Sequence, residues 1–160
     1  MGEKWSNYLI HENFLLCFFA FLVLGCAQET GYNSVTPTIV AKGNLTGNGK
    51  EQFSKQSVVI SDSVTWKKLI VGMNSVSDVS GSFLETHIDF TQYTVLAVFD
   101  DVRPTLGYSI DINIVEDDKK VYVEVINKMP SGNVLTALIT TQPYLIVKIP
   151  KTEKTIQFNS

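Results

Sequence analysis

Apolar and polar residues alternate along much of this chain with the two-residue period of a β-strand. Residues 107–115 show the pattern most clearly, because a bulky apolar side chain recurs at every second position from Tyr108 to Ile114, and these side chains would share one face. Residues 93–99 are instead apolar almost without interruption, which is typical of a central strand buried on both faces. Further segments rich in β-branched and aromatic residues predict strands at 57–60, 121–126, 134–140, 144–149 and 155–158.

One segment has the period of an amphipathic helix. Its apolar residues follow the spacing i, i+3, i+4 and i+7, and they are Trp66, Leu69, Ile70 and Met73. Asp62 or Ser61 would cap its N-terminus, and Gly72 and Asn74 favour its end. Several short strands with a single helix predict a mainly β fold (α+β with one amphipathic helix), either an antiparallel β-sandwich or a partly open barrel. We expect the helix to cover one end or face of it.

The most apolar stretch of the chain, residues 14–24, is followed directly by Gly25 and Cys26. An apolar segment that ends at a small residue is typical of a secretory signal peptide. The stretch is shorter than the roughly 20 residues that span a bilayer. A lipoprotein signal, a plain signal peptide or anchor, and a buried core helix are the three interpretations, and the residues around Cys26 favour the first.

Those residues, Val23-Leu24-Gly25-Cys26, resemble the lipobox of bacterial lipoproteins. The resemblance implies that the Cys26 thiol is acylated, for example with palmitate, and that the chain is cut before Cys26. The mature protein would then be lipid-anchored in the bacterial cell envelope, at the outer membrane, on its periplasmic or surface face. We therefore expect a lipoprotein signal peptide at 1–25, a lipidated cysteine and flexible tether at 26–52, and a β domain at 53–160.

The composition of the mature chain indicates a linker and argues against a nucleic-acid partner and a disulfide. Residues 27–52 are rich in Gly, Asn, Thr and Ser, as in a flexible linker, although residues 38–42 could equally form a first strand. The mature chain is nearly neutral and has no basic stripe, so nucleic acid is not an expected partner. The chain has two cysteines, Cys17 and Cys26. Cleavage before Cys26 would remove Cys17, and the one cysteine that remains could not form an intramolecular disulfide.

The residues offer little for catalysis or metal binding. His87 is the last histidine in the chain, and on a strand it would share a face with Asp89; a polar strand entry is favoured over a base–orienter pair. One histidine and an acylated cysteine cannot supply the usual zinc ligands. The acidic groups at 100–101 and 116–118 could bind calcium but lack the EF-hand spacing, so solvated turns are favoured. We expect no enzyme activity, no cofactor and no metal.

Four segments, taken in order, resemble the C-terminal domain of the PrcB-type protease-complex subunits. The resemblance covers about residues 55–158 and implies a lipoprotein of a family whose founding type associates with a secreted serine protease. The family's loop usually reads Thr-Gly-Gly-Tyr, whereas this chain has Leu106 before Gly107, and a positive φ at Leu106 would be strained. The segments are 88–90, 103–110, 129–132 and 141–150.

Residues 103–108 also resemble, more weakly, the Asn-Pro-Thr-Thr-Gly-Tyr loop of chagasin-type inhibitors of cysteine proteases. This weaker resemblance implies a loop that meets a protein partner, and Arg and Tyr are frequent at interface hot spots. The alternative is a plain strand connection in which Tyr108 begins the core face of the next strand. We expect Gln142-Pro143-Tyr144 on a second loop, which could end near residues 103–108 in a sandwich. The candidate partner-binding residues are Arg103, Pro104, Thr105, Gly107, Tyr108, Pro143 and Tyr144.

Together these features predict a lipid-anchored, non-enzymatic interaction protein. By resemblance, its partner would be a secreted or surface protease, which it would bind or stabilise. The alternative is a chagasin-like protease inhibitor acting through residues 103–108.

Overall fold

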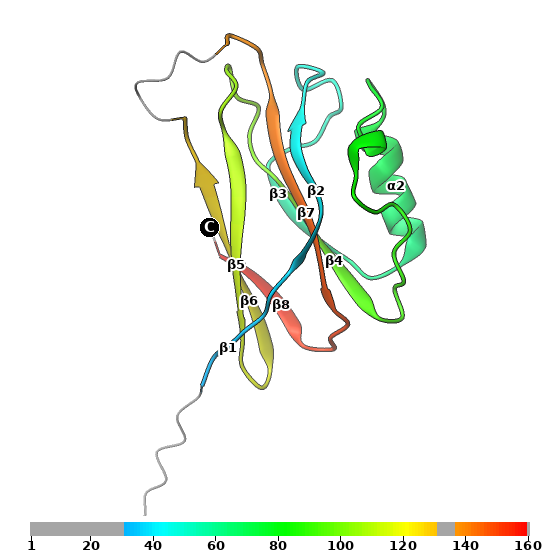
Figure 1. Cartoon of the computed structure of the whole chain (residues 1–160), viewed down its shortest axis with the longest axis vertical. Helices are drawn as coiled ribbons and strands as arrows, with labels where there is room; N and C mark the ends of the chain where they lie inside the picture. Colours follow the sequence, from blue (N-terminus) through cyan, green and yellow to red (C-terminus); the bar gives the residue numbers. More distant parts are fainter. Residues whose placement is uncertain (1–30, 131–136, 160) are drawn as a thin grey trace, which may run out of the picture. The chain divides into compact units, whose positions relative to one another are not determined.

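Two four-stranded sheets face each other, and one helix covers the outer face of the second sheet (Figure 1). The computed structural model describes residues 31–130 and 137–159, and the compact unit that they form runs from Tyr32 to the end of the chain. The strand order is β1-β5-β6-β8 in the first sheet and β2-β7-β4-β3 in the second. Neighbouring strands are antiparallel except for β6 and β8, which are parallel. The predicted mainly β sandwich is confirmed, and the described residues contain one α-helix.

The elements have the following bounds: β1 Asn33–Ser34, β2 Thr38–Leu45, β3 Gln56–Ile60, α2 Ser63–Met73, the 3-10 turn η1 Ser80–Ser82, β4 Tyr93–Phe99, β5 Ser109–Glu116, β6 Lys120–Lys128, β7 Gln142–Pro150 and β8 Thr155–Asn159.

The central strands β4 and β7 are apolar on both faces because each face packs against a different core. Val95, Ala97 and Phe99 of β4 lie in the core between the second sheet and α2. Leu96 and Val98 lie in the core between the two sheets. The continuous apolar run at 93–99 therefore indicates a strand with both faces buried, as predicted.

Helix α2 begins where the sequence predicts. Asp62 is its N-cap, and its Oδ1 accepts hydrogen bonds from the backbone of Val64 at 2.9 Å and of Thr65 at 2.8 Å. These bonds satisfy amide groups that have no partner within the helix. Trp66 and Met73 are buried on the sheet side, and the indole Nε1 of Trp66 donates to the carbonyl of Thr86 at 2.8 Å. The apolar stripe thus holds the helix on the sheet.

The expected boundary at residue 53 lies too far along the chain. Residues 38–45 form β2, which pairs with β7, and its Val40, Ala41 and Leu45 are buried in the core beneath α2. The strand alternative for residues 38–42 is therefore correct. The Gly- and Asn-rich residues that follow form the connection between β2 and β3, where turn-forming residues are needed.

Two expectations near β7 are also wrong. Residues 137–140 are not a strand, and the other three residues of the strand predicted at 134–140 lie outside the described residues. Gln142 and Pro143 do not split two strands but begin β7. Pro143 is tolerated there because it lies near the start of the strand, where a missing N–H costs little, and its carbonyl still accepts from Asp100 N at 3.0 Å.

The described residues contain no helix that is long and apolar enough to cross a membrane.

Truncating Leu45 tests whether β2 is part of the folded body. Leu45 is 1% exposed, so Leu45→Ala should lower the free energy of unfolding by about 2–5 kcal/mol through lost burial and an unfilled cavity. Urea denaturation followed by Trp66 fluorescence would measure it. Ile39→Ala, at a position 46% exposed on the same strand, should cost under about 1 kcal/mol. Equal, negligible effects of both variants would mean that this segment is a tether after all.

Candidate protein-interaction site

The loop between β4 and β5, residues 100–108, lies against the segment that leads into β7. Arg103 and Thr141 form an antiparallel bridge, with Arg103 N donating to Thr141 O at 2.7 Å and Thr141 N donating to Arg103 O at 2.9 Å. The hydroxyl of Thr141 donates to Thr105 O at 3.1 Å, and Leu106 N donates to Ala137 O at 3.2 Å. The sequence placed residues 103–108 and the start of β7 near one another only as an expectation, and the structure brings them together.

A buried ion pair fixes the loop at its start. Asp100 is 2% exposed, and its Oδ2 accepts from Arg103 Nε at 2.9 Å and from Arg103 Nη2 at 2.7 Å. Lys55 Nζ lies 3.6 Å from the other carboxylate oxygen. A carboxylate this deeply buried requires such partners, because an unpaired buried charge is strongly destabilising. Two of the guanidinium donors of Arg103 are therefore engaged inside the domain rather than free for a partner.

Gln142 joins the loop to the second sheet from the other side. Its side chain is 1% exposed, and its Nε2 donates to the carbonyl of Asp100 and to that of Phe53, both at 2.8 Å. These bonds satisfy two carbonyls where chain segments meet at the end of the sheet. The loop is thus held by β4, β7 and the segment that precedes β3.

Tyr108 packs against Arg103 instead of beginning the core face of β5. The guanidinium carbon lies 5.1 Å from the centroid of the Tyr108 ring, which is within cation–π range. The positive φ of this loop falls on Gly107, at +96°, and Leu106 is not among the described non-glycine residues with positive φ. Leu106 therefore takes the place of the family's glycine without the strain that its substitution suggested.

Pro143 and Tyr144 are not available to a partner, which corrects their place among the candidate residues. Both are buried in β7, and Tyr144 lies in the core beneath α2, with its ring centroid 6.4 Å from that of Phe99. Burial raises the pKa of Tyr144, since the phenolate would lose its hydration. The aromatic character that suggested an interface residue serves packing here.

Exposed apolar side chains surround the fixed loop. Val102 is 42% exposed, Leu138 is 89% exposed and Ile139 is 49% exposed, and the bonds of Arg103 and Leu106 to residues 137–141 bring their backbones together. We call Val102, Arg103, Leu138 and Ile139 the loop-end surface. Sequence reasoning missed Leu138 and Ile139 because their apolar, β-branched surroundings are those of a core strand, and nothing local distinguishes the two cases.

The other chemical candidates have structural roles. Asp89 accepts from Thr91 N at 2.9 Å and from the Thr91 hydroxyl, and these bonds lower the pKa of Asp89. Asp89 begins the turn that leads into β4 and does not lie on a strand. The shared strand face on which the disfavoured base–orienter pair of His87 and Asp89 depended is therefore not formed. Asp117 accepts from the backbones of Lys119 and Lys120, both at 2.7 Å, within the β5–β6 hairpin. No group of three or more potential metal ligands occurs in residues 31–130 and 137–159.

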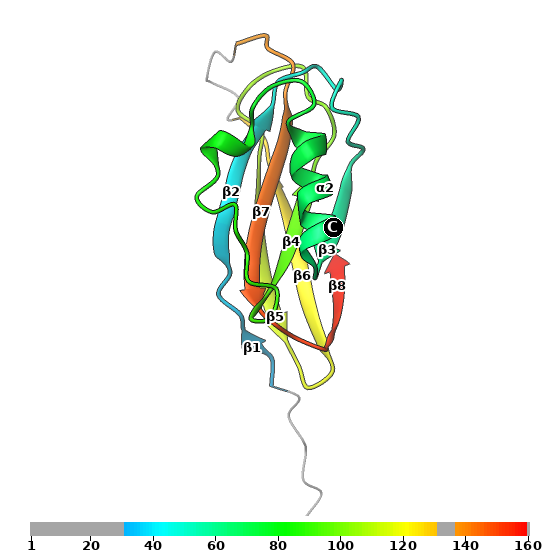
Figure 2. The same ribbon diagram turned by 90° about the vertical axis from the view of Figure 1, so that its right-hand side faces the viewer.

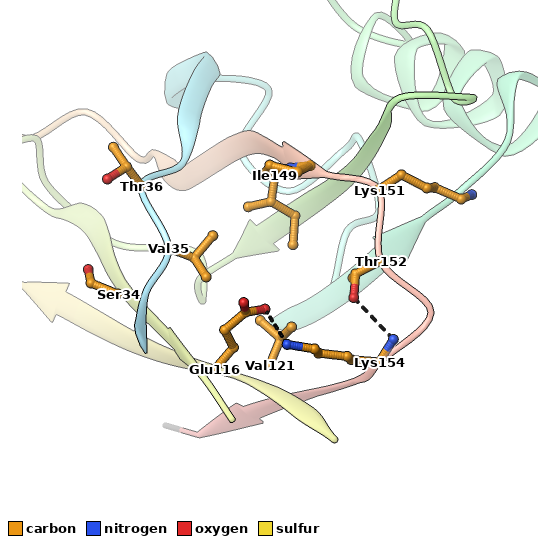
Figure 3. A pocket seen from close by; sticks show the side chains of 10 residues that line it. Ser34, Val35, Thr36, Glu116, Val121, Ile149, Lys151, Thr152 and Lys154 are labelled. Atoms are coloured by element: carbon orange, nitrogen blue, oxygen red, sulfur yellow. Dashed lines mark hydrogen bonds and ion pairs between the residues drawn. The ribbon is translucent and has the colours of Figure 1, made fainter. Parts of the chain in front are cut away.

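A hollow of about 430 Å³ lies at the opposite end of the sandwich, beside β1 (Figure 3). Val35, Val121 and Ile149 form its apolar wall. At its rim the ammonium of Lys154 pairs with Glu116 at 3.1 Å. The charges of Glu116 and Lys154 thus neutralise each other. We interpret this hollow as the open mouth between the two sheets, because its polar groups do not converge on one point.

Comparison with protein families gives a match to part of the chain. Residues 94–150 match a family model described as PrcB C-terminal, which confirms the resemblance found in the sequence over a shorter range than 55–158. The match runs through β4, β5, β6 and β7 and contains the whole loop-end surface. No curated protein and no solved structure matched the chain.

Removing Arg103 tests whether the ion pair fixes the loop. Arg103→Ala leaves Asp100 buried with only Lys55 nearby, so the free energy of unfolding should fall by roughly 2–3 kcal/mol, moderated because Arg103 is 29% exposed. Lys55→Ala, which removes an exposed partner, should cost under about 1 kcal/mol. Urea denaturation of both variants gives the comparison. Equal costs would show that Arg103 does not hold the buried carboxylate.

Proposed function

We propose that this chain is a non-catalytic, lipid-anchored accessory protein that binds a secreted or surface protease through its loop-end surface. The observation that carries the proposal is the combination of exposed Leu138 and Ile139 with a rigid loop, all within the segment that matches the PrcB C-terminal family. Contiguous exposed apolar side chains mark interaction sites. A loop already ordered loses little further entropy when it binds.

The position of the loop-end surface supports this role. Strand β1 pairs with Val115 and Glu116 at the end of β5, whereas the loop-end surface adjoins its beginning. The eight residues of β5 separate the two by about 25 Å at 3.3 Å per residue. A tether that enters at β1 therefore leaves the loop-end surface at the far end of the domain, accessible to a partner.

The segment between the lipidated cysteine and the folded domain would be short. The folded unit begins at Tyr32, so the chain from Cys26 to Tyr32 spans at most about 20 Å when fully extended. Acylation of Cys26 would keep the domain within that distance of a membrane. Stable anchoring takes more than one acyl chain, since a single chain binds only marginally.

Replacing the two apolar residues with carboxylates tests the binding surface. The tagged full-length protein would be purified from detergent-solubilised membranes of its own host, with mass spectrometry and a protein-substrate assay on the eluate. Wild type should retain a stoichiometric, active protease, and Leu138→Asp with Ile139→Asp should reduce its recovery about tenfold or more, because apolar contacts at an interface are replaced by desolvated charges. Val71→Asp, at a position 70% exposed on α2, is the matched control. Equal recovery from all three proteins, or no protease in any eluate, would contradict the proposal.

The alternative of a chagasin-like inhibitor differs in the sign of the effect. Under inhibition, the co-purified protease would be silent and would gain activity when the domain is removed. Under the accessory role, removal would leave its activity unchanged or lower it.

The lipid anchor is tested at Cys26. Cys26→Ser should move the protein from the membrane fraction to the soluble fraction, because serine lacks the thiol that would carry the lipid. Fractionation with immunoblotting measures the distribution, and Cys17→Ser, within the apolar stretch, is the control that should remain membrane-bound. A Cys26→Ser protein whose signal is cut and which still sediments with membranes would exclude anchoring through this residue.

A further inference from the structure

Strand β3 is an unprotected edge of the second sheet. Its five residues, Gln56–Ile60, pair with β4 in unbroken register and contain no proline, glycine or charge. By contrast, β2 at the other edge of the sheet has a register shift at Val40, and Leu84 N donates to the Val40 carbonyl. Natural proteins protect edge strands with such devices. No described strand pairs with the outer side of β3, which lies at the margin of the sheet beyond α2 (Figure 2).

The space between the two sheets is closed on the β2 side and open on the β3 side. On the β2 side, Lys42 of one sheet forms an ion pair with Asp111 of the other, and hydrogen bonds from Lys128 and from Lys42 lower the pKa of Asp111. On the β3 side, two hollows open between the sheets. The first, about 200 Å³, lies beside Lys55, Gln56 and Ser57, and the second, about 290 Å³, lies beside Val59 and Ser61.

The hollows lie at equal distances along the chain from Val58, the middle residue of β3. A two-fold axis at Val58, normal to the sheet, would pair β3 with β3 of a second copy in antiparallel register. Residue 55 would then face residue 61 of the other copy, and Ser57 would face Val59. The first hollow of one copy would therefore lie beside the second hollow of the other copy, and the second beside the first.

We propose that the partner of this edge is a second copy of the chain, which pairs β3 with β3 to give one continuous eight-stranded sheet. Val59, which is 41% exposed, would reach the hollow whose walls include Val98, Phe99 and Val125. Ser57 would reach the hollow whose walls include Thr94, Thr152 and the charged side chains of residues 151, 153 and 154. Val59 thus meets an apolar wall and Ser57 a polar one, and each contact occurs twice about the axis, as in an isologous interface.

The neighbouring sheet fits the same axis. Strand β8 pairs with residues 120–124 of β6 and stops at Asn159 opposite Glu124, which leaves residues 125–128 of β6 without a partner on that side. The first hollow includes Val125 and Asn127 of this unpaired part, whereas the second includes Ile156 of β8. Exchanging the hollows therefore places β8 of each copy beside the unpaired part of β6 in the other.

The register also places groups of both signs at each end of the paired strands. Lys55 with Asp100 and Asp101 of one copy would face Ser61 of the other, beside a hollow that Lys151, Glu153 and Lys154 line. Like charges are not placed directly opposite each other along β3 itself, because its residues are uncharged.

Sedimentation and cross-linking of residues 32–160 test the proposal, since this unit contains both cores. The wild-type domain should sediment as a dimer at tens of micromolar. Val59→Lys should raise the dimer dissociation constant at least tenfold, because it places a charge in the apolar hollow. Val71→Lys, the same change at an exposed position of α2, should leave the dimer intact.

A single cysteine identifies the register. Both native cysteines precede residue 32, so Val58→Cys introduces the sole thiol, and mild oxidation should link two copies through Val58 at the axis. Val71→Cys should remain a monomer under the same conditions on a reducing-agent-free gel.

A domain that is monomeric at several hundred micromolar would overturn the proposal. So would a dimer that tolerates Val59→Lys, or a monomer whose Val59→Lys variant loses protease recovery, since the edge would then bind another protein. Protease recovery through the loop-end surface is measured separately and does not depend on this result.

Discussion

The structure depends on two strands, β4 and β7, that bury both of their faces. Each contributes alternate side chains to two cores, so the helix layer and the first sheet are both packed on the same pair of strands. This constraint explains the composition of both strands, which are apolar with little alternation, whereas β5 and β6 alternate because one face of their sheet meets solvent. It also explains why α2 needs only one apolar stripe.

The loop-end surface takes its rigidity from these same strands. Asp100 follows the last residue of β4, and Gln142 is the first residue of β7, so the groups that fix the loop are held at the ends of the best-packed strands. An ion pair and two amide hydrogen bonds to carbonyls then transmit that order to the backbone of residues 100–108. A surface built in this way exposes apolar side chains without relying on a flexible loop, and rigid presentation of this kind favours protein recognition.

Much of the fold could be predicted from the sequence because its signals are local. The N-cap at Asp62, the stripe from Trp66 to Met73 and the double-sided burial of residues 93–99 each follow from spacing within one element. What the sequence did not disclose depends on neighbours distant along the chain. Residues 38–52 resemble a linker in composition, and only the pairing of β2 with β7 shows that the first of them are a strand.

The candidate site was predicted in part for the same reason. Residues 103–108 were found through a resemblance, and their contact with Thr141 through tertiary structure alone. Arg103 and Tyr144 are of the residue types that are frequent at protein interfaces. However, Arg103 is bound to the buried carboxylate of Asp100, and Tyr144 lies in the core. Residue type alone cannot separate an anchor for a partner from an anchor for the fold, because both roles reward large side chains with a polar group.

The parallel pairing of β6 with β8 has a consequence for the order of folding. Parallel strands cannot be joined by a tight turn, and here the chain leaves the first sheet after β6, builds the centre of the second sheet with β7, and then returns. Strand β8 therefore gains its partner only after β7 has been inserted between β2 and β4, since closing this long connection must follow the contacts that shorten it. By this argument the C-terminal strand is the last segment to be incorporated as the chain folds.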